Sequence, residues 1–445
     1  MWTTASVRRR RRKALFPAIF VAALALLPAA AIGAQPASDP ARGGGQPADR
    51  PSPAQAGDAL PPTEADEPDS AIEPDPSDPL PPTGIEAELE RMRPGTAIKR
   101  KFDEIAAKTN IRLGFASTFL FQQATAGPGE RSAGGGDLDL LAKWTAIGAG
   151  TEDTGILAFA GEYRFQIGDQ APAALGSEIG TLLPTTNAFS ERPPVVKELY
   201  WDQRLLGDRF RYVAGRVDPE NLFGGHRLQS ANLYFLNKAF SSNPAVAYPG
   251  PGFAAAAQIK PVSWLYIDGG INDANGKATM GNFEGFIEDK EFLTFGEAAL
   301  TPTIDGLGAG RYRVAIWHID ARDEAGAPSD QGVTISLDQD FGESVTAFAR
   351  YSHADGDVTN VTNSVQGGVG IRGLFAEEDM LGLAAAWSDP KADGLRDETV
   401  IEVFERLQVT ESAQLMFGVQ TIFDPSNAPD DDVLGVFSVR LRVAF

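Results

Sequence analysis

Residues 433–445 alternate strictly between apolar and mixed positions. The odd-numbered positions are Val, Gly, Phe, Val, Leu, Val and Phe, whereas the even-numbered ones include Arg440 and Arg442. A period of two residues is typical of a β-strand. One face of this strand suits lipid and the other suits water, which fits a transmembrane barrel. From this stretch alone, a half-buried strand of a soluble sandwich remains the alternative.

The same alternation recurs in sixteen runs that continue to the end of the chain. Most runs are roughly nine to thirteen residues long, which matches a tilted membrane-spanning strand of about 9–11 residues. They begin near Ile111, Leu138, Ile156, Val195, Phe210, Phe253, Val262, Phe292, Tyr312, Val333, Val345, Val365, Leu381, Val400, Ala413 and Val433.

The connections between these runs alternate between long and short. The long ones are 123–136, 168–194, 218–250, 272–290, 320–330, 353–362, 388–397 and 424–432, and the other set is mostly short turns. Long loops on one side and short turns on the other are typical of outer-membrane barrels, and a soluble sandwich gives no reason for them. The pattern therefore predicts an all-β fold, a transmembrane antiparallel β-barrel of about 16 strands at residues 109–445.

Three segments precede the predicted barrel. Residues 1–34 combine a basic start, an apolar stretch and small residues, which predicts a signal peptide; a retained membrane anchor is the alternative. Residues 35–83 hold thirteen of the 31 prolines and ten acids, which predicts a disordered Pro-rich acidic linker. Residues 84–108 show helical spacing, which predicts short periplasmic helices.

Composition excludes several classes of function. The 445 residues include no Cys and three His, so the chain offers no thiolate chemistry and little for a metal site. The formal charge of −21 argues against nucleic acid as a partner. His318 and His353 lie near strand ends without a Ser and an acid placed beside them, so we expect neither an enzyme nor a cofactor.

The strand face opposite to the lipid face is rich in charge, and this predicts a water-filled interior. An Arg on the lipid face of a barrel costs about 2–4 kcal/mol at the membrane midplane, so these side chains must point inward. Some of them could hydrogen-bond to hydroxyl-rich solutes, and the rings of Trp264 and Trp317 could cover a sugar face. The candidates chosen by strand parity are Arg164, Arg209, Arg211, Trp264, Asp268, Arg313, Trp317, Glu402 and Arg406.

The longest connection, 218–250, follows the fifth strand and contains a possible short helix around 228–240. A loop of this length that folds into the lumen would narrow it. We expect this loop, helped by 168–194, to form the constriction; an extracellular surface loop is the alternative.

Several stretches in order resemble the carbohydrate-selective porin family of Gram-negative outer membranes. They cover roughly residues 95–445, and they are KELYWDQRLLGDRFRYVAGRVDPENLF (197–223), NPAVAYPGPGFAAAAQIKPVSWLYIDGGINDANG (243–276), FGEAALTP with GRYRVAIWH (295–318), GGVGIRGLFAEEDMLGLAAAWSD (367–389) and ETVIEVFERLQVTESAQLMFGVQTIFDPS (398–426) with the terminal SVRLRVAF. The resemblance implies a sixteen-stranded barrel with passive diffusion of sugars. The residues that it would assign to the pathway are Glu198, Arg216, Asp218, Asp268, Glu297 and Glu402.

The sequence thus predicts an outer-membrane porin for small hydrophilic solutes, with carbohydrates as the first candidate. A general or anion-preferring porin is one alternative, because arginines dominate the predicted lumen. A cell-wall tether, in which residues 35–108 bind peptidoglycan and the barrel is the anchor, is another. We expect export by the signal peptide to the outer membrane of a Gram-negative bacterium, contact with its lipid, and either a monomer or a homotrimer.

Overall fold

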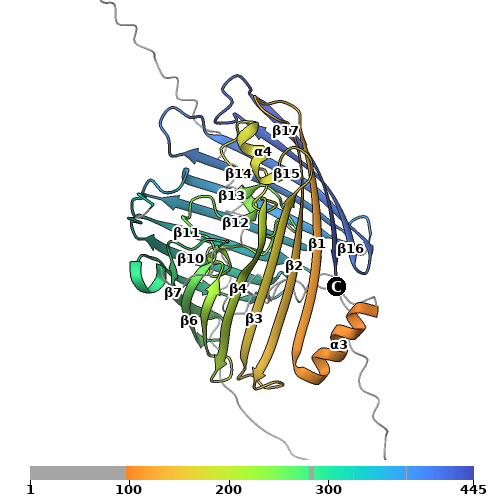
Figure 1. The fold of residues 1–445 in the computed structure, drawn as a ribbon, viewed down its shortest axis with the longest axis vertical. Coiled ribbons are helices and arrows are strands. Elements are labelled where there is room, and N and C mark those ends of the chain that lie inside the picture. The colour runs from red at the N-terminus through yellow and green to blue at the C-terminus, as the bar shows by residue number, and fades with distance from the viewer. Residues whose placement is uncertain (1–96, 280–284, 324, 377) are drawn as a thin grey trace, which may run out of the picture. The chain divides into compact units, whose positions relative to one another are not determined.

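The structure is a computed structural model that describes residues 97–279, 285–323, 325–376 and 378–445. The predicted signal peptide, the Pro-rich linker and residues 84–96 of the helical segment lie outside the described residues. Figure 1 shows the described part as a set of long, neighbouring strands.

Sixteen long antiparallel strands form the sheet of the described residues (Figure 1). A seventeenth, β9 (Thr303–Ile304), has two residues and pairs only with the start of β10. The long strands are β1 (Ile111–Ala124), β2 (Ser132–Ile147), β3 (Gly155–Gln166), β4 (Arg192–Leu205), β5 (Phe210–Val217), β6 (Gly252–Val262), β7 (Leu265–Asp273), β8 (Phe292–Leu300), β10 (Gly308–Ile319), β11 (Asp330–Phe341), β12 (Val345–Ala354), β13 (Val361–Arg372), β14 (Met380–Pro390), β15 (Glu398–Thr410), β16 (Ala413–Phe423) and β17 (Val433–Ala444).

The first strand closes the sheet on itself. β1 pairs with β2 in the register Ser117↔Leu138 and with β17 in the register Ser117↔Val443. Each other long strand pairs with its neighbours along the chain, and β8 joins β10 directly. A closed sheet leaves no free edge, so every strand has hydrogen-bonded partners on both sides. The predicted sixteen-stranded antiparallel barrel is confirmed.

The two faces of the strands differ as the alternation requires. In β17, Phe437 is 54% exposed on the outside, whereas Arg440 and Arg442 are 2% and 3% exposed on the inside. The exposed outer side chains of the other strands are mainly Leu, Ile, Val and Phe. This outer apolar surface is what lipid requires, and most charged positions of the strands accordingly face inward.

The largest deviation from the predicted strand starts is in β2, where glycines hide the alternation. β2 begins at Ser132, six residues before the predicted Leu138, and its added segment includes Gly134, Gly135 and Gly136. The Cβ of an alanine at Gly136 would lie 2.3 Å from the Phe165 ring, so the ring of β3 covers this position. Glycine has no side chain that would distinguish the inner from the outer face, so the alternation of apolar and polar residues cannot be seen at these positions.

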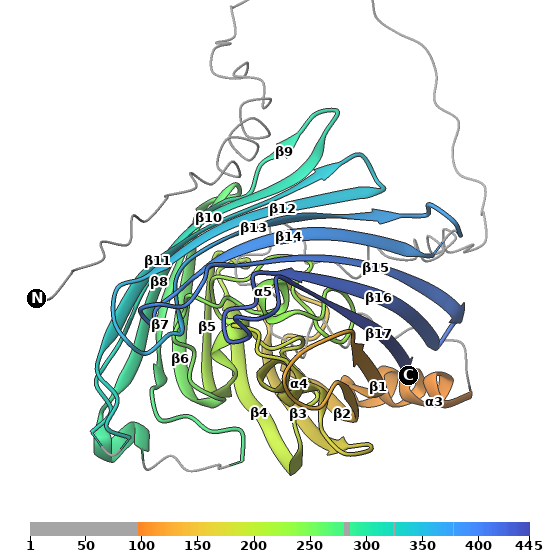
Figure 2. The ribbon, with the colours of Figure 1, turned by 90° about the horizontal axis from the view of Figure 1, so that it is seen from above.

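Helices are few and short. α3 (Ala97–Thr109) precedes β1 and contacts it; α4 (Pro172–Glu178) and α5 (Lys238–Ser241) belong to two long loops. η2 (Pro219–Asn221) opens the loop of α5, and η3 (Gly285–Asp289) lies before β8. Figure 2 shows α5 within the ring of strands and α3 beside β1. No helix of the described chain is both long and apolar enough to cross a membrane.

Candidate solute pathway

The loop between β5 and β6, residues 218–251, lies inside the barrel and is called the inner loop below. None of its residues is exposed; all are buried or partly buried. It begins with the η2 turn, where the Asp218 side chain accepts a hydrogen bond from the Glu220 N–H at 3.2 Å. Figure 2 shows this segment crossing the ring of strands. The structure therefore places the predicted 218–250 segment in the lumen and not on the outer surface.

Buried carboxylates of the wall hold the inner loop by its N–H groups. Glu402 of β15 accepts from Leu236 N at 2.6 Å and from Asn237 N at 2.9 Å. Glu297 of β8 accepts from Gly224 N at 3.0 Å. Gly224 has a φ of +72°, and a Cβ there would lie 2.7 Å from the Tyr248 hydroxyl, so the loop needs glycine at this position.

Arginines of the wall hold the same loop by its carbonyl groups. Arg440 of β17 donates to Ala231 O at 2.7 Å and to Tyr234 O at 2.9 Å. Arg350 of β12 donates to Gly224 O at 2.9 Å. Carboxylates thus accept from the loop and guanidinium groups donate to it. Hydrogen bonds to charged groups are worth about 1.5–3 kcal/mol, so this set ties the inner loop firmly to β8–β17.

His226 packs within the inner loop as a neutral ring. Its ring stacks on Phe348 with centroids 3.9 Å apart. Burial, together with the nearby Arg350 charge, lowers the pKa of His226 well below its usual range. The neutral ring can donate from Nε2 to Phe240 O at 2.8 Å and accept at Nδ1 from Leu228 N at 3.2 Å. The histidine is therefore a structural part of the loop.

The second long loop, residues 167–191, folds against the first. Its Leu182 N–H donates to Glu398 of β15 at 2.6 Å, and its Thr185 hydroxyl donates to Gln122 of β1 at 2.8 Å. Asn187 joins the two loops, because its Nδ2 donates to Glu220 of the inner loop at 3.0 Å. The two loops form one body that fills the barrel toward β1 and β11–β17.

An open cavity of about 670 Å³ remains between this body and the wall of β2–β4, and Arg311 and Arg313 of β10 also line it. Seven basic and five acidic residues line it, together with amides and hydroxyls, and the described lining contains no Phe, Tyr or Trp ring. The charged lining residues are Asp139, Glu162, Arg164, Arg192, Lys197, Glu198, Asp218, Glu220, Arg227, Lys277, Arg311 and Arg313. The cavity is thus the candidate solute pathway, and it lies to one side of the barrel.

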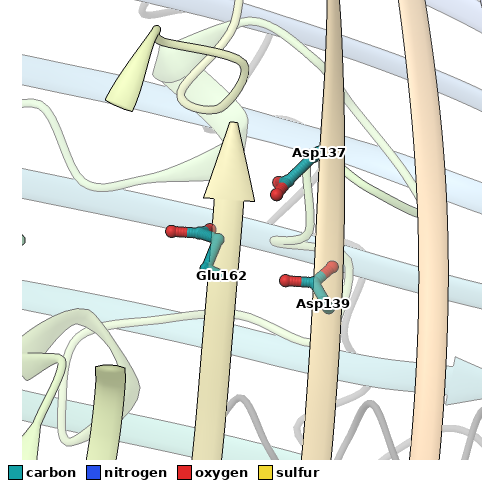
Figure 3. Close-up of side chains that lie close together, drawn as sticks. All are labelled: Asp137, Asp139 and Glu162. Atoms are coloured by element: carbon teal, nitrogen blue, oxygen red, sulfur yellow. The ribbon is translucent and has the colours of Figure 1, made fainter. Parts of the chain in front are cut away.

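Three carboxylates of this wall come close together. Figure 3 shows Asp137 and Asp139 of β2 facing Glu162 of β3, with one oxygen from each within 4.8 Å of the others. Arg164 contacts Asp137 at 3.1 Å and Glu162 at 2.6 Å, and Arg192 contacts Glu162 at 2.7 Å. These guanidinium groups supply the positive charge that a metal ion would otherwise bring, and we assign no metal to the cluster.

A β-bulge brings two consecutive residues of β4 into the cavity. Ala160 pairs with Glu198 and Gly161 pairs with Val196, so Lys197 is the extra residue between two pairs. Strict alternation would turn Lys197 outward; the bulge lets Lys197 and Glu198 both line the cavity. Glu198 accepts from Asp218 N at 3.1 Å and from Asn221 Nδ2 at 2.9 Å. Lys197 Nζ lies 3.4 Å from Asp218 Oδ2.

Of the residues proposed from the sequence, four line the cavity: Arg164, Glu198, Asp218 and Arg313. Others face the interior but are covered. Arg211 donates two hydrogen bonds to the Asp202 carboxylate in a bidentate arrangement, at 2.8 and 2.9 Å. Arg216 donates to Val196 O at 2.8 Å. The remaining covered residues are Asp268, Glu297, Glu402 and Arg406.

The placement of three residues differs from the prediction. Trp264 lies in the turn between β6 and β7 and is 54% exposed, so it is not on the inner face. Arg209 lies in the β4–β5 turn, where it donates to Pro261 O at 2.9 Å. Trp317 does face inward but is 3% exposed and does not line the cavity. Its ring packs over Gly332, where an added Cβ would lie 2.7 Å from the ring.

Trp317→Ala should therefore lower stability without changing the interaction with solutes. Removal of a buried Trp costs about 3–5 kcal/mol in protein cores. Unfolding of the variant in denaturant measures the first effect, and block of ion current by a neutral sugar measures the second. A weaker sugar block in a folded Trp317→Ala protein would show that the Trp317 ring does contact the solute.

Several lining residues were not among the pathway residues predicted from the sequence. Two of them lie on strands: Arg192 at the start of β4 and Glu162 on the inner face of β3. Asn187, Glu220 and Arg227 come from the two loops, and no periodicity marks the direction of a loop side chain. Strand parity could have identified the first group, but it could not have identified the loop residues.

A closed sixteen-stranded barrel with an apolar outer face and a charged, loop-narrowed interior is the architecture of an outer-membrane porin. Residues 168–445 match the family described as carbohydrate-selective porin, OprB family, and the chain belongs to this family. The family and the fold are those of a channel and indicate an outer-membrane protein.

Individual relatives agree with this assignment. Porin AaxA of Chlamydia abortus is 26% identical over 263 residues, and Porin AaxA of Chlamydia caviae is 24% identical over 264 residues. Each match covers 57% of this chain, and the chain spans 58% of the length of either relative. The high-pH structure of OprB from Pseudomonas putida superposes with a TM-score of 0.62 at 14% identity, covering 77% of this chain and 96% of that one.

Proposed function

We propose that the protein is a passive pore for small hydrophilic solutes, with neutral carbohydrates as its main class. The observation that carries this is the cavity of about 670 Å³, whose lining combines donors and acceptors with charges that are mostly paired. A sugar hydroxyl can both donate and accept, so it can exchange water for such groups in either direction. Since the described lining holds no Phe, Tyr or Trp ring, the contacts would be mainly hydrogen bonds and not stacking.

Export and assembly are parts of the same proposal. Residues 1–34 would direct export and be removed, and the barrel would then sit in the outer membrane of a Gram-negative cell. The protein would act without catalysing a reaction and without a cofactor. Residues 35–108 could contact peptidoglycan, and the barrel could function alone or as a homotrimer.

Swelling of liposomes that contain the purified protein tests the pore. The three solutes would be a neutral hexose, its aldonate anion and its amino-sugar cation, which have nearly the same size. We expect the hexose to enter fastest. Equal entry of all three would indicate a general porin, and faster entry of the aldonate would indicate an anion-preferring one. Liposomes with an unrelated folded protein provide the baseline, and entry no faster than this baseline would refute the pore.

A further inference from the structure

The ion pair between Lys197 and Asp218 is the most accessible ion pair between lining residues of the cavity. The side chains of Lys197 and Asp218 are 25% and 17% exposed, whereas those of Arg164 and Glu162 are 9% and 2% exposed. Lys197 belongs to β4 and Asp218 directly follows β5, the neighbouring strand, so the pair lies on the wall of the cavity at the point where the inner loop begins. A permeating solute therefore meets this ammonium group more directly than it meets the guanidinium groups behind it.

Several basic lining residues are balanced by acids outside the lining. Arg227 contacts Asp340 at 2.8 Å, Arg311 contacts Asp338 at 3.2 Å, and Arg313 lies 3.5 Å from Glu297. Arg164 contacts Asp137 outside the lining at 3.1 Å but also Glu162 within it at 2.6 Å, so it is kept in the count, and with the other three set aside four basic residues face five acidic ones. The basic ones are Arg164, Arg192, Lys197 and Lys277; the acidic ones are Asp139, Glu162, Glu198, Asp218 and Glu220. The net charge of these nine residues is thus close to zero, and Lys197 is one of the four basic residues that keep it there.

Asp218 contacts the Lys197 ammonium group at 3.4 Å, and Glu198 is the next residue of β4. Glu162, Asp218 and Glu198 all attract the ammonium group, and Arg164 is the neighbouring cation that opposes them. Arg164 is already engaged by Asp137 and Glu162. Loss of the Lys197 charge would therefore remove the cation that contacts Asp218 and would leave the charge of Glu198, the next residue of β4, less compensated.

We propose that Lys197, which the β-bulge turns into the cavity, sets the charge selectivity of the pore by cancelling the carboxylates of Glu198 and Asp218. The proposal rests on the proposed pore function and adds to it the residue that keeps the pathway nearly indifferent to ion charge. A pathway without a strong electrostatic field favours neither cations nor anions, and neutral polar solutes can pass through it.

Reversal potentials in planar bilayers across a KCl gradient test this. Lys197→Gln and Lys197→Glu should raise the ratio of cation to anion permeability, by about threefold or more for Lys197→Glu, because one charge near the path changes sign. Lys197→Arg should leave the ratio as in the wild type. Asp218→Asn, which can still accept from Glu220 N, should shift the ratio toward anions.

Lys260→Gln is the matched control. Lys260 also forms an ion pair, with Asp208 at 2.7 Å and with side chains 17% and 27% exposed, but it lies at the short-turn end of β6. We expect no shift in its reversal potential. Heat-modifiable electrophoretic mobility shows whether each variant has folded. If Lys197→Glu does not fold, Asp218→Asn still tests the ion pair from its acidic side.

The outcomes separate this proposal from the pore function. Reversal potentials that are the same in wild type, Lys197→Glu and Asp218→Asn would overturn the role of Lys197, even if sugars enter liposomes. A shift of equal size in Lys260→Gln would also overturn it. In a further outcome, the reversal potential shifts only in the Lys197 and Asp218 variants of a protein that admits ions but no sugar. That result would support the role of Lys197 in charge selectivity and refute the carbohydrate function.

Discussion

Replacing residues 222–248 by a short Gly-Ser turn is expected to raise single-channel conductance by at least about twofold, because a sixteen-stranded barrel without its inner loop encloses a wide aqueous channel. The retained residues 218–221 keep the Lys197–Asp218 contact and the η2 turn. The inner loop fills the side of the barrel next to β8–β17, where Glu402, Arg350 and Arg440 hold it. These side chains would become hydrated when the loop is absent, so the wall itself should remain folded.

Conductance in planar bilayers measures this effect, and shortening the 320–329 loop is the control. That loop joins β10 and β11 at the rim, so its truncation should leave conductance unchanged. An inner-loop deletion that folds and conducts like the wild type would show that the second loop, 167–191, sets the width of the channel by itself.

The barrel could be predicted because lipid imposes a rule on every second residue of each strand. Val433 to Phe445 obey it without exception, and the register β1–β17 later places Phe437 and Leu441 outward. The rule gives no signal where a position has no side chain, as at the glycines that begin β2. The alternation of long and short connections supported the barrel independently, because loop length does not enter the strand assignment.

The pathway was less predictable because parity fixes a face and not what covers that face. Glu402 and Arg406 face inward, yet the inner loop covers both. Trp317 is also buried, and its ring packs over Gly332 of β11. The β-bulge at Lys197 reverses parity at one residue. The contact between Asn187 and Glu220 joins the two loops through residues that are 33 positions apart in sequence. Only the folded loops bring those side chains together.

Glu402 explains how a loop of this length stays in place inside a water-filled barrel. Both of its oxygens accept from consecutive N–H groups, those of Leu236 and Asn237, and the Asn237 side chain donates to Gln420 of β16 at 2.9 Å. Glu402→Leu would leave both N–H groups without an acceptor, at a cost of about 1–3 kcal/mol for each buried donor. Glu402→Gln keeps one carbonyl oxygen and should have a smaller effect.

The expected result for Glu402→Leu is an inner loop that leaves the wall part of the time. Trypsin reports this directly, because the loop contains Arg227 and Lys238, which are buried or partly buried in the native loop. We expect slow or no cleavage there in the wild type, faster cleavage in Glu402→Gln and the fastest in Glu402→Leu. Open-channel current noise should rise in the same order.

Glu405→Gln provides the control for this series, since Glu405 lies on the same strand but on its outer face. Its cleavage rate should equal that of the wild type. If Glu402→Leu and the wild type were cut in the loop at the same rate, the hydrogen bonds to Glu402 would not hold the loop. The arginine contacts from Arg350 and Arg440 would then be the ones that retain it, because they bind the loop carbonyls on either side of Leu236.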